Sequence, residues 1–198
     1  MMSLDLLLAI IGFSLVTSVT PGPNNMMLMT SGVNFGLRRT VPHIFGVTFG
    51  HGLMVFLIGV GVTEMVKAQP QAVIVLKVMA VGYMLWLAWK IRNAAPPEGE
   101  EAGGAPFTFL QAVALQWVNP KALAMAMGLM GAYGAKGDVA WVATITAVFC
   151  VVNFPSVGLW AVMGEALRGW LQDRARLRLF NATMAVLLLA SLLPLLRM

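Results

Sequence analysis

The chain has 198 residues, of which 59% are apolar and only 11% are charged, whereas soluble domains average roughly 45–50% apolar and about 25% charged residues. This balance excludes a water-soluble domain, which needs more polar surface, and a disordered chain, which is poor in apolar residues. Because a helix needs about 20 apolar residues to span a bilayer, there is room for about six spans. The composition predicts an integral membrane protein.

The charges and the cysteine content exclude two further classes. The net charge is +5, but the basic residues lie between apolar runs, so we expect no binding to nucleic acid. Cys150 is the only cysteine, which excludes an intrachain disulfide. The first 20 residues contain Asp5 and no basic residue, unlike a cleaved signal peptide. We expect this segment to be retained as the first span.

Six apolar runs follow one another, and each is predicted to be a helix because lipid cannot satisfy exposed peptide groups. They cover residues 4–30, 41–63, 70–91, 107–133, 139–164 and 179–196. A polar segment with three prolines, three glutamates and three glycines separates the third run from the fourth. We expect a single transmembrane domain, residues 1–198, with a first half at about 1–92, a linker at 93–106 and a second half at about 107–198.

The basic residues between the runs predict the orientation. Eight lie on the side that follows the first, third and fifth runs, and three lie on the other side. Since an excess of lysine and arginine marks the cytoplasmic side, both termini are expected to face away from the cytoplasm. The eight are Arg38, Arg39, Lys90, Arg92, Arg168, Arg174, Arg176 and Arg178, and the three are Lys67, Lys136 and Arg197.

Short matches between the two halves indicate a duplication. Val19-Thr20-Pro21 in the first run matches Val118-Asn119-Pro120 in the fourth, at an offset of 99 residues. A unit with an odd number of spans re-enters the membrane inverted, and inverted repeats are a transporter architecture whose site lies where broken helices meet. We therefore predict an all-α integral membrane protein with six transmembrane helices in two inverted three-helix repeats, the first and fourth helices being broken at their proline motifs.

The first break is predicted at residues 20–25, inside an otherwise apolar run. Its two prolines remove backbone donors, and Gly22 lets the chain leave helical geometry. The amides after Pro23 suit a carboxylate, whereas the freed carbonyls before Pro21 suit an ammonium group or a cation. A site with both groups matches a zwitterionic amino acid, although a simple proline kink would show the same pattern.

Two further proline motifs lie in the second half. In the fourth run, Pro120 is followed by Lys121, and a charge about halfway along a span is costly and marks a functional site unless the side chain snorkels to the membrane surface. In the fifth run, Asn153 and Pro155 predict a third break. The candidate substrate-binding residues are Thr20, Pro21, Gly22, Pro23, Asn24, Asn25, Gln116, Asn119, Pro120, Lys121 and Asn153.

Several of these motifs resemble the lysine exporter (LysE/RhtB) family of small bacterial inner-membrane amino-acid efflux proteins. They are the run at 20–25, the Gly36-Leu37-Arg38-Arg39 turn, Gly46 and Gly50, the Trp-Leu-Ala-Trp-Lys run at 86–90, and Asn119-Pro120-Lys121. The resemblance covers essentially the whole chain and is closest to the neutral-amino-acid branch, which includes the cysteine/O-acetylserine and homoserine/threonine exporters.

The resemblance implies a secondary transporter and not an enzyme. It implies export of small amino acids or their derivatives across the bacterial inner membrane by proton antiport, without a cofactor. With the charge bias described above, both termini are then periplasmic. Its partners are then the substrate, protons and the lipid bilayer, and a homodimer is left open.

Proton antiport requires a group inside the spans whose charge can change. Lys121 is the first candidate because it lies centrally in a span. His51 is the second, because imidazole titrates near neutral pH, although a neutral hydrogen-bonded residue that packs helices is the favoured reading of this histidine.

Two alternatives remain open on the sequence. A divalent-metal exporter of the same superfamily needs clusters of carboxylate, histidine or cysteine in its spans, but His43 and His51 are eight residues apart and no carboxylate lies deep in a run, so no metal site is expected. A non-transporting scaffold would explain the Gly46-x-x-x-Gly50 packing motif. It would not explain Lys121 or the broken helices.

Overall fold

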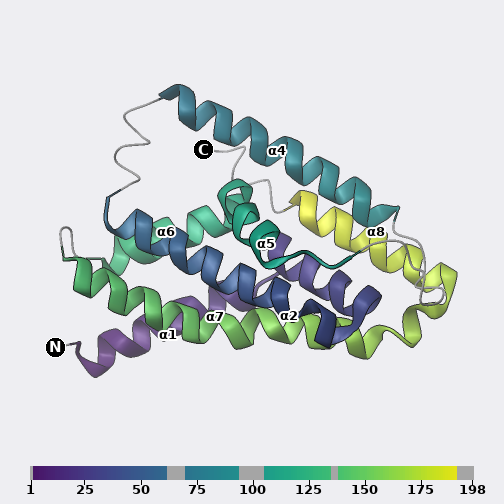
Figure 1. The fold of residues 1–198 in the computed structure, drawn as a ribbon, viewed down its shortest axis with the longest axis horizontal. Coiled ribbons are helices and arrows are strands. Elements are labelled where there is room, and N and C mark those ends of the chain that lie inside the picture. The colour runs from purple at the N-terminus through teal and green to yellow at the C-terminus, as the bar shows by residue number, and fades with distance from the viewer. Residues whose placement is uncertain (1, 62–69, 94–104, 135–137, 191–198) are drawn as a thin grey trace.

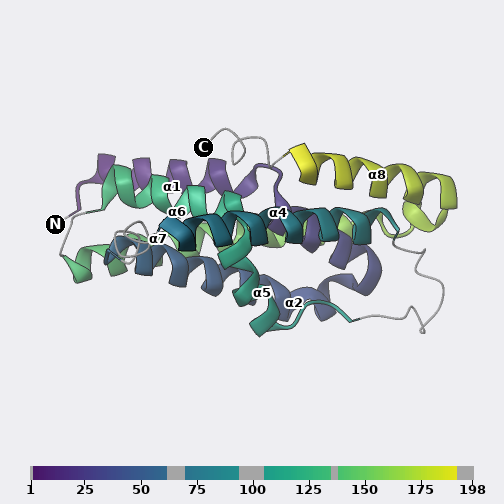
Figure 2. The same ribbon diagram turned by 90° about the horizontal axis from the view of Figure 1, so that it is seen from above.

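The computed structural model describes residues 2–61, 70–93, 105–134 and 138–190, which form helices and no strands. The long helices run roughly along one axis of the molecule, and the short α5 crosses them (Figure 1 and Figure 2). The predicted all-α class is confirmed. The elements are α1 (Leu4–Val19), α2 (Pro23–Gly59), α4 (Pro70–Arg92), α5 (Phe109–Leu115), the 3-10 helix η1 (Gln116–Val118), α6 (Pro120–Tyr133), α7 (Val139–Leu167), the 3-10 helix η2 (Trp170–Gln172) and α8 (Arg174–Ala190).

The side chains are distributed as in a membrane protein, with apolar groups outside and many polar groups inside. Large apolar side chains such as Leu8, Val151 and Leu179 are 57%, 73% and 69% exposed, whereas serine, asparagine, glutamine and histidine side chains are buried. Two helices, α2 and α7, are long and apolar enough to cross a bilayer by length and composition. Large apolar side chains exposed along several helices, with polar side chains buried between them, are typical of a membrane protein.

The long helix α2 turns back on itself at Gly36 (Figure 1). The φ of this residue is 75°, a left-handed value that favours glycine. The sequence predicts that the first run ends at residue 30 and the second begins at 41, but the helix extends to the turn on both sides because one glycine makes the reversal. The hydroxyls of Ser31 and Thr40 hydrogen-bond across the turn at 2.8 Å.

Both arms of α2 pack closely against α7. A Cβ at Gly32 would collide with the backbone of Ala161, and a Cβ at Gly164 would collide with the backbone of Met29. Past the turn, the amide of Leu37 donates to the Glu165 carboxylate at 3.1 Å. These contacts make α2 and α7 the scaffold against which the broken helices are placed.

The third predicted break, at residues 153–155, is wrong. Helix α7 is continuous, with Pro155 inside it. A proline removes one backbone hydrogen bond, and a membrane helix tolerates this loss where neighbouring helices support it. Helix α7 packs closely along α2, where a Cβ at Gly164 would collide with the backbone of Met29. Asn153 therefore projects from an unbroken helix.

The two other predicted breaks are present. Helix α1 ends before the Pro21 motif and α2 begins after it, while α5 passes through η1 to an extended Asn119 before α6 begins. Both breaks lie near the middle of the long axis (Figure 2). The turn of α2, the C-terminal ends of α4 and α7 and the start of α8 gather at one end of the molecule (Figure 1). The eight basic residues expected on one side lie on these segments.

Candidate functional site

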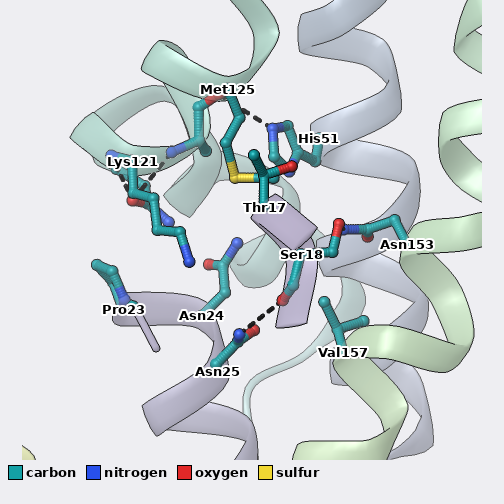
Figure 3. Close-up of a pocket in the computed structure, with 13 residues that line it drawn as sticks. Thr17, Ser18, Pro23, Asn24, Asn25, His51, Lys121, Met125, Asn153 and Val157 are labelled. Carbon is teal, nitrogen blue, oxygen red and sulfur yellow. Dashed lines mark hydrogen bonds between the residues drawn. The ribbon is translucent and has the colours of Figure 1, made fainter. Parts of the chain in front are cut away.

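The two breaks face each other across a small polar cavity (Figure 3). The space between its atoms, including the part open to the outside, is about 260 Å³. The lining residues are Thr17, Ser18, Gly22, Pro23, Asn24, Asn25, His51, Asn119, Lys121, Ala122, Met125, Asn153 and Val157.

Most of the predicted site residues line this cavity, and four do not. Thr20 and Pro21 do not line the cavity, but their carbonyl groups accept hydrogen bonds from Lys121, which does. Gln116 is fully buried and bonds to a lining residue, and Pro120 forms the first turn of α6.

Lys121, the second residue of α6, bridges the two breaks. Its ammonium group donates to the Thr20 carbonyl, to the Thr20 hydroxyl at 2.9 Å and to the Pro21 carbonyl at 3.1 Å. The sequence predicts that these freed carbonyls receive the ammonium of a substrate or a cation. In this structure the ammonium group of Lys121 occupies them instead.

Gly22 makes room for the lysine. A Cβ at this position would lie 2.5 Å from Cδ and 3.1 Å from Nζ of Lys121. The backbone of Gly22 is extended, with φ −178° and ψ 178°, which any residue can adopt. The requirement for glycine is therefore space for the Lys121 side chain and not backbone freedom.

The other freed carbonyls at the end of α1 are also bonded. The Asn25 side-chain amide donates to the carbonyls of Ser18 and Thr20, both at 2.8 Å, and the Trp160 indole donates to the Val19 carbonyl at 3.2 Å. The break is a fixed, hydrogen-bonded structure and not a loose kink.

The two half-helices differ at their N-termini. Asn119 caps α6, because its side-chain oxygen accepts from the amides of Lys121 and Ala122 at 3.1 and 3.3 Å. Gly22 begins α2 without a side-chain cap. Since the first amides of a helix carry partial positive charge and need acceptors, α2 offers free amides for an anionic group at the cavity.

His51 reaches the cavity from the second arm of α2. Its Nε2 lies 3.0 Å from the Ala122 carbonyl; a carbonyl only accepts, so this nitrogen carries the proton. The ring meets Phe149 edge-on at 4.7 Å and is 2% exposed. These contacts match the favoured reading, a hydrogen-bonded histidine that packs helices.

Comparison with known proteins identifies the family. The sequence model of the LysE type translocator family matches residues 15–197. The chain belongs to the LysE type translocator family. The resemblance found in the sequence is confirmed, and the protein is a transporter rather than an enzyme.

The curated relatives of this LysE type translocator include cysteine/O-acetylserine efflux proteins. Those of Escherichia coli (strain K12) and Shigella sonnei (strain Ss046) are each 27% identical over 190 residues, which cover 94% of this chain and 95% of the relative. That of Shigella flexneri is 27% identical over 179 residues, which cover 89% and 90%. No solved structure matches the chain significantly.

Five lining residues of the translocator were not predicted. Two of them, Thr17 and Ser18, lie on α1, where Ser14, Thr17 and Ser18 are spaced three and four residues apart and so share one helix face. This polar face in an apolar run is a signal that could have found them. Ala122, Met125 and Val157 are apolar and carry no such signal.

Proposed function

We propose that this translocator exports small zwitterionic amino acids or their derivatives from the cytoplasm by proton antiport. The observation that carries the proposal is the cavity where the two breaks meet, with Lys121 of one half bound to the break of the other. Broken helices from two halves that meet at one site are a transporter arrangement. The names of the cysteine/O-acetylserine efflux relatives support an amino-acid substrate.

The proposed topology is six spans in two inverted three-helix repeats, at about 1–92 and 107–198, in the bacterial inner membrane. Gly36 divides α2 into the second half of span one and the whole of span two. The gathering of the basic segments at one end supports a cytoplasmic orientation of that end. The termini are then both periplasmic.

The charge of the cavity favours a neutral amino acid as substrate. The ammonium of Lys121 is the one charged group among the described residues that line it. A substrate lysine or arginine would bring a second positive charge beside it, in surroundings where like charges repel strongly. We expect cysteine, threonine, homoserine and similar small zwitterions to be carried and cationic amino acids to be poor substrates.

The proposed coupling group is Lys121. While protonated, it makes charge-assisted hydrogen bonds to the break in α1, and these are about twice as strong as neutral ones. Loss of the proton weakens them and lets the two breaks separate. On the cytoplasmic side the substrate carboxylate then binds at the neutral amine and the first amides of α2. On the periplasmic side a proton restores the ammonium group, which returns to the carbonyls of the break and displaces the substrate, and this proton later leaves on the cytoplasmic side. His51 is the second candidate.

The two alternatives find less support. Among the described residues no group of three histidine, cysteine, aspartate or glutamate side chains could hold a metal ion. The Gly46 and Gly50 faces that a scaffold would offer to a partner are occupied within the chain, because a Cβ at either would crowd Phe109 or Val113 of α5.

An export assay tests the proposal. Cells that overproduce the protein should accumulate cysteine, threonine or homoserine outside and resist toxic analogues of these amino acids. Cells that overproduce Lys121→Gln at equal membrane abundance should not. Efflux of arginine or lysine above that of the neutral amino acids would contradict the proposed substrate class.

A further inference from the structure

Asn153 carries a buried acceptor with no partner. Its side-chain amide donates to the Ser18 hydroxyl at 2.9 Å, while its Oδ1 has no hydrogen bond. The residue is 1% exposed. A buried polar atom without a partner destabilises the folded protein, and such atoms are rare enough to require an explanation.

The position of this acceptor gives the explanation. Asn153 lines the cavity from α7, on the side opposite Lys121, with Asn24 between them (Figure 3). Of the described cavity-lining residues, it alone has a buried side-chain polar atom without a partner. The hydrogen bond to Ser18 holds the Asn153 side chain in place at the cavity, so Ser18 is a positioning residue.

The cavity is therefore polarised. One side carries the Lys121 ammonium and the uncapped N-terminus of α2, which both attract an anion. The opposite side carries the neutral oxygen of Asn153. The carbonyls freed by the break in α1 are not available, because Lys121, Asn25 and Trp160 bond to them.

We propose that Asn153 Oδ1 receives the α-ammonium group of the substrate, whose carboxylate points toward Lys121 and the first amides of α2. This inference rests on the proposed function and adds the orientation of the substrate to it. Asn153 thereby selects amino acids over acids of the same shape that lack the amino group. Lys121 selects them over amines that lack the carboxylate.

Two ligand analogues and two variants test the orientation in proteoliposomes. The probe is inhibition of radiolabelled cysteine binding, measured without a pH gradient, by 3-mercaptopropionate, which lacks the amino group, by cysteamine, which lacks the carboxylate, and by unlabelled cysteine. In the wild type both analogues should inhibit far less well than cysteine. Asn153→Leu should reduce the preference for cysteine over 3-mercaptopropionate by roughly ten- to a hundred-fold, the factor expected for a lost hydrogen bond to a charged group. It should leave the preference over cysteamine unchanged.

Two further variants and a control complete this comparison of the two preferences. Lys121→Gln should reduce the preference over cysteamine and leave the preference over 3-mercaptopropionate. Asn153→Asp keeps an acceptor and should retain or increase the preference for cysteine over 3-mercaptopropionate, which tests the idea even where Asn153→Leu does not fold. Thr144→Val, on the exposed face of α7, is the matched control and should change neither ratio.

The outcomes separate this inference from the proposed function. Wild-type transport of cysteine together with equal effects of Asn153→Leu on both ratios overturns the orientation and leaves the exporter intact. Loss of amino-group preference in Asn153→Asp overturns it as well. Absence of amino-acid transport by the wild type contradicts the proposed function itself.

Discussion

Asn24 and Gln116, which are 92 residues apart in the sequence, pair their side-chain amides in both directions across the two halves of the chain. Nδ2 of Asn24 lies 2.8 Å from Oε1 of Gln116, and Nε2 of Gln116 lies 3.3 Å from Oδ1 of Asn24. Both side chains are buried. The pair ties the first turn of α2 to η1, so the two breaks are fixed relative to each other.

Removal of one partner of this pair should destabilise the protein. Asn24→Ala or Gln116→Ala leaves a buried amide unpaired, which costs about 1–3 kcal/mol. The double variant should lose less than the sum of the two, with a coupling energy of about 0.5–3 kcal/mol. Unfolding in detergent followed by circular dichroism measures all three. Strictly additive losses would show that the pair has no energetic role.

Gly22→Ala should impair transport while leaving the fold intact. The added methyl group occupies the space of the Lys121 side chain, but the extended backbone at this position accepts any residue. Gly12→Ala is the matched control, because a Cβ there meets nothing within 4 Å. We expect Gly22→Ala to lose most amino-acid efflux at normal membrane abundance and Gly12→Ala to keep it. Normal efflux by Gly22→Ala would argue against the bridge between Lys121 and the break in α1.

Gly164→Ala should destabilise the contact between α7 and the first arm of α2. The new Cβ collides with the backbone of Met29, which cannot rotate away, and overpacking of this kind costs about 1–3 kcal/mol. Gly158→Ala lies on the same helix with open space around it and should be neutral or stabilising by up to about 1 kcal/mol. Thermal unfolding of both variants in detergent measures the difference. Equal unfolding temperatures would show that this helix contact is looser than the structure has it.

The sequence predicts the parts of the fold that depend on backbone chemistry. The prolines at 21, 23 and 120 remove backbone donors in apolar surroundings, and the helices break at both motifs. Pro155 carries the same signal but lies within a continuous helix. Its surroundings decide the outcome, since α7 packs closely along α2. Local sequence does not reveal such support.

The sequence could not predict which side chains satisfy the breaks. Charge in a span marks Lys121, but its bonds to Thr20 and Pro21 join residues about 100 positions apart. The reciprocal pairing of Asn24 with Gln116 and the unpartnered oxygen of Asn153 are likewise products of packing. Residue types predicted most of the residues that line the cavity. Contacts between residues far apart in the sequence determine which of their polar groups are bonded.

The proposed orientation predicts a labelling pattern in intact cells. Cys150 is the only cysteine, so a Cys150→Ala background allows single cysteines to be placed at Ser3, before α1, and at Gln172, in the segment between α7 and α8. A maleimide that cannot cross the inner membrane should label Ser3→Cys in intact cells and Gln172→Cys only after lysis. The reverse pattern would show that the N-terminus is cytoplasmic and the segment between α7 and α8 periplasmic. Labelling of both positions in intact cells would contradict a cytoplasmic location of the basic end.

The central claim is that the cavity between the two breaks carries a neutral amino acid in exchange for protons, with Lys121 as the coupling group. Its most direct test is radiolabelled cysteine transport in proteoliposomes with an imposed pH gradient, for the wild type and for Lys121→Gln at equal protein content. The account predicts that the wild type accumulates cysteine when the gradient is applied and that Lys121→Gln does not respond to it while still folding. Gradient-driven accumulation by Lys121→Gln, with the pH dependence of the wild type, would contradict the account.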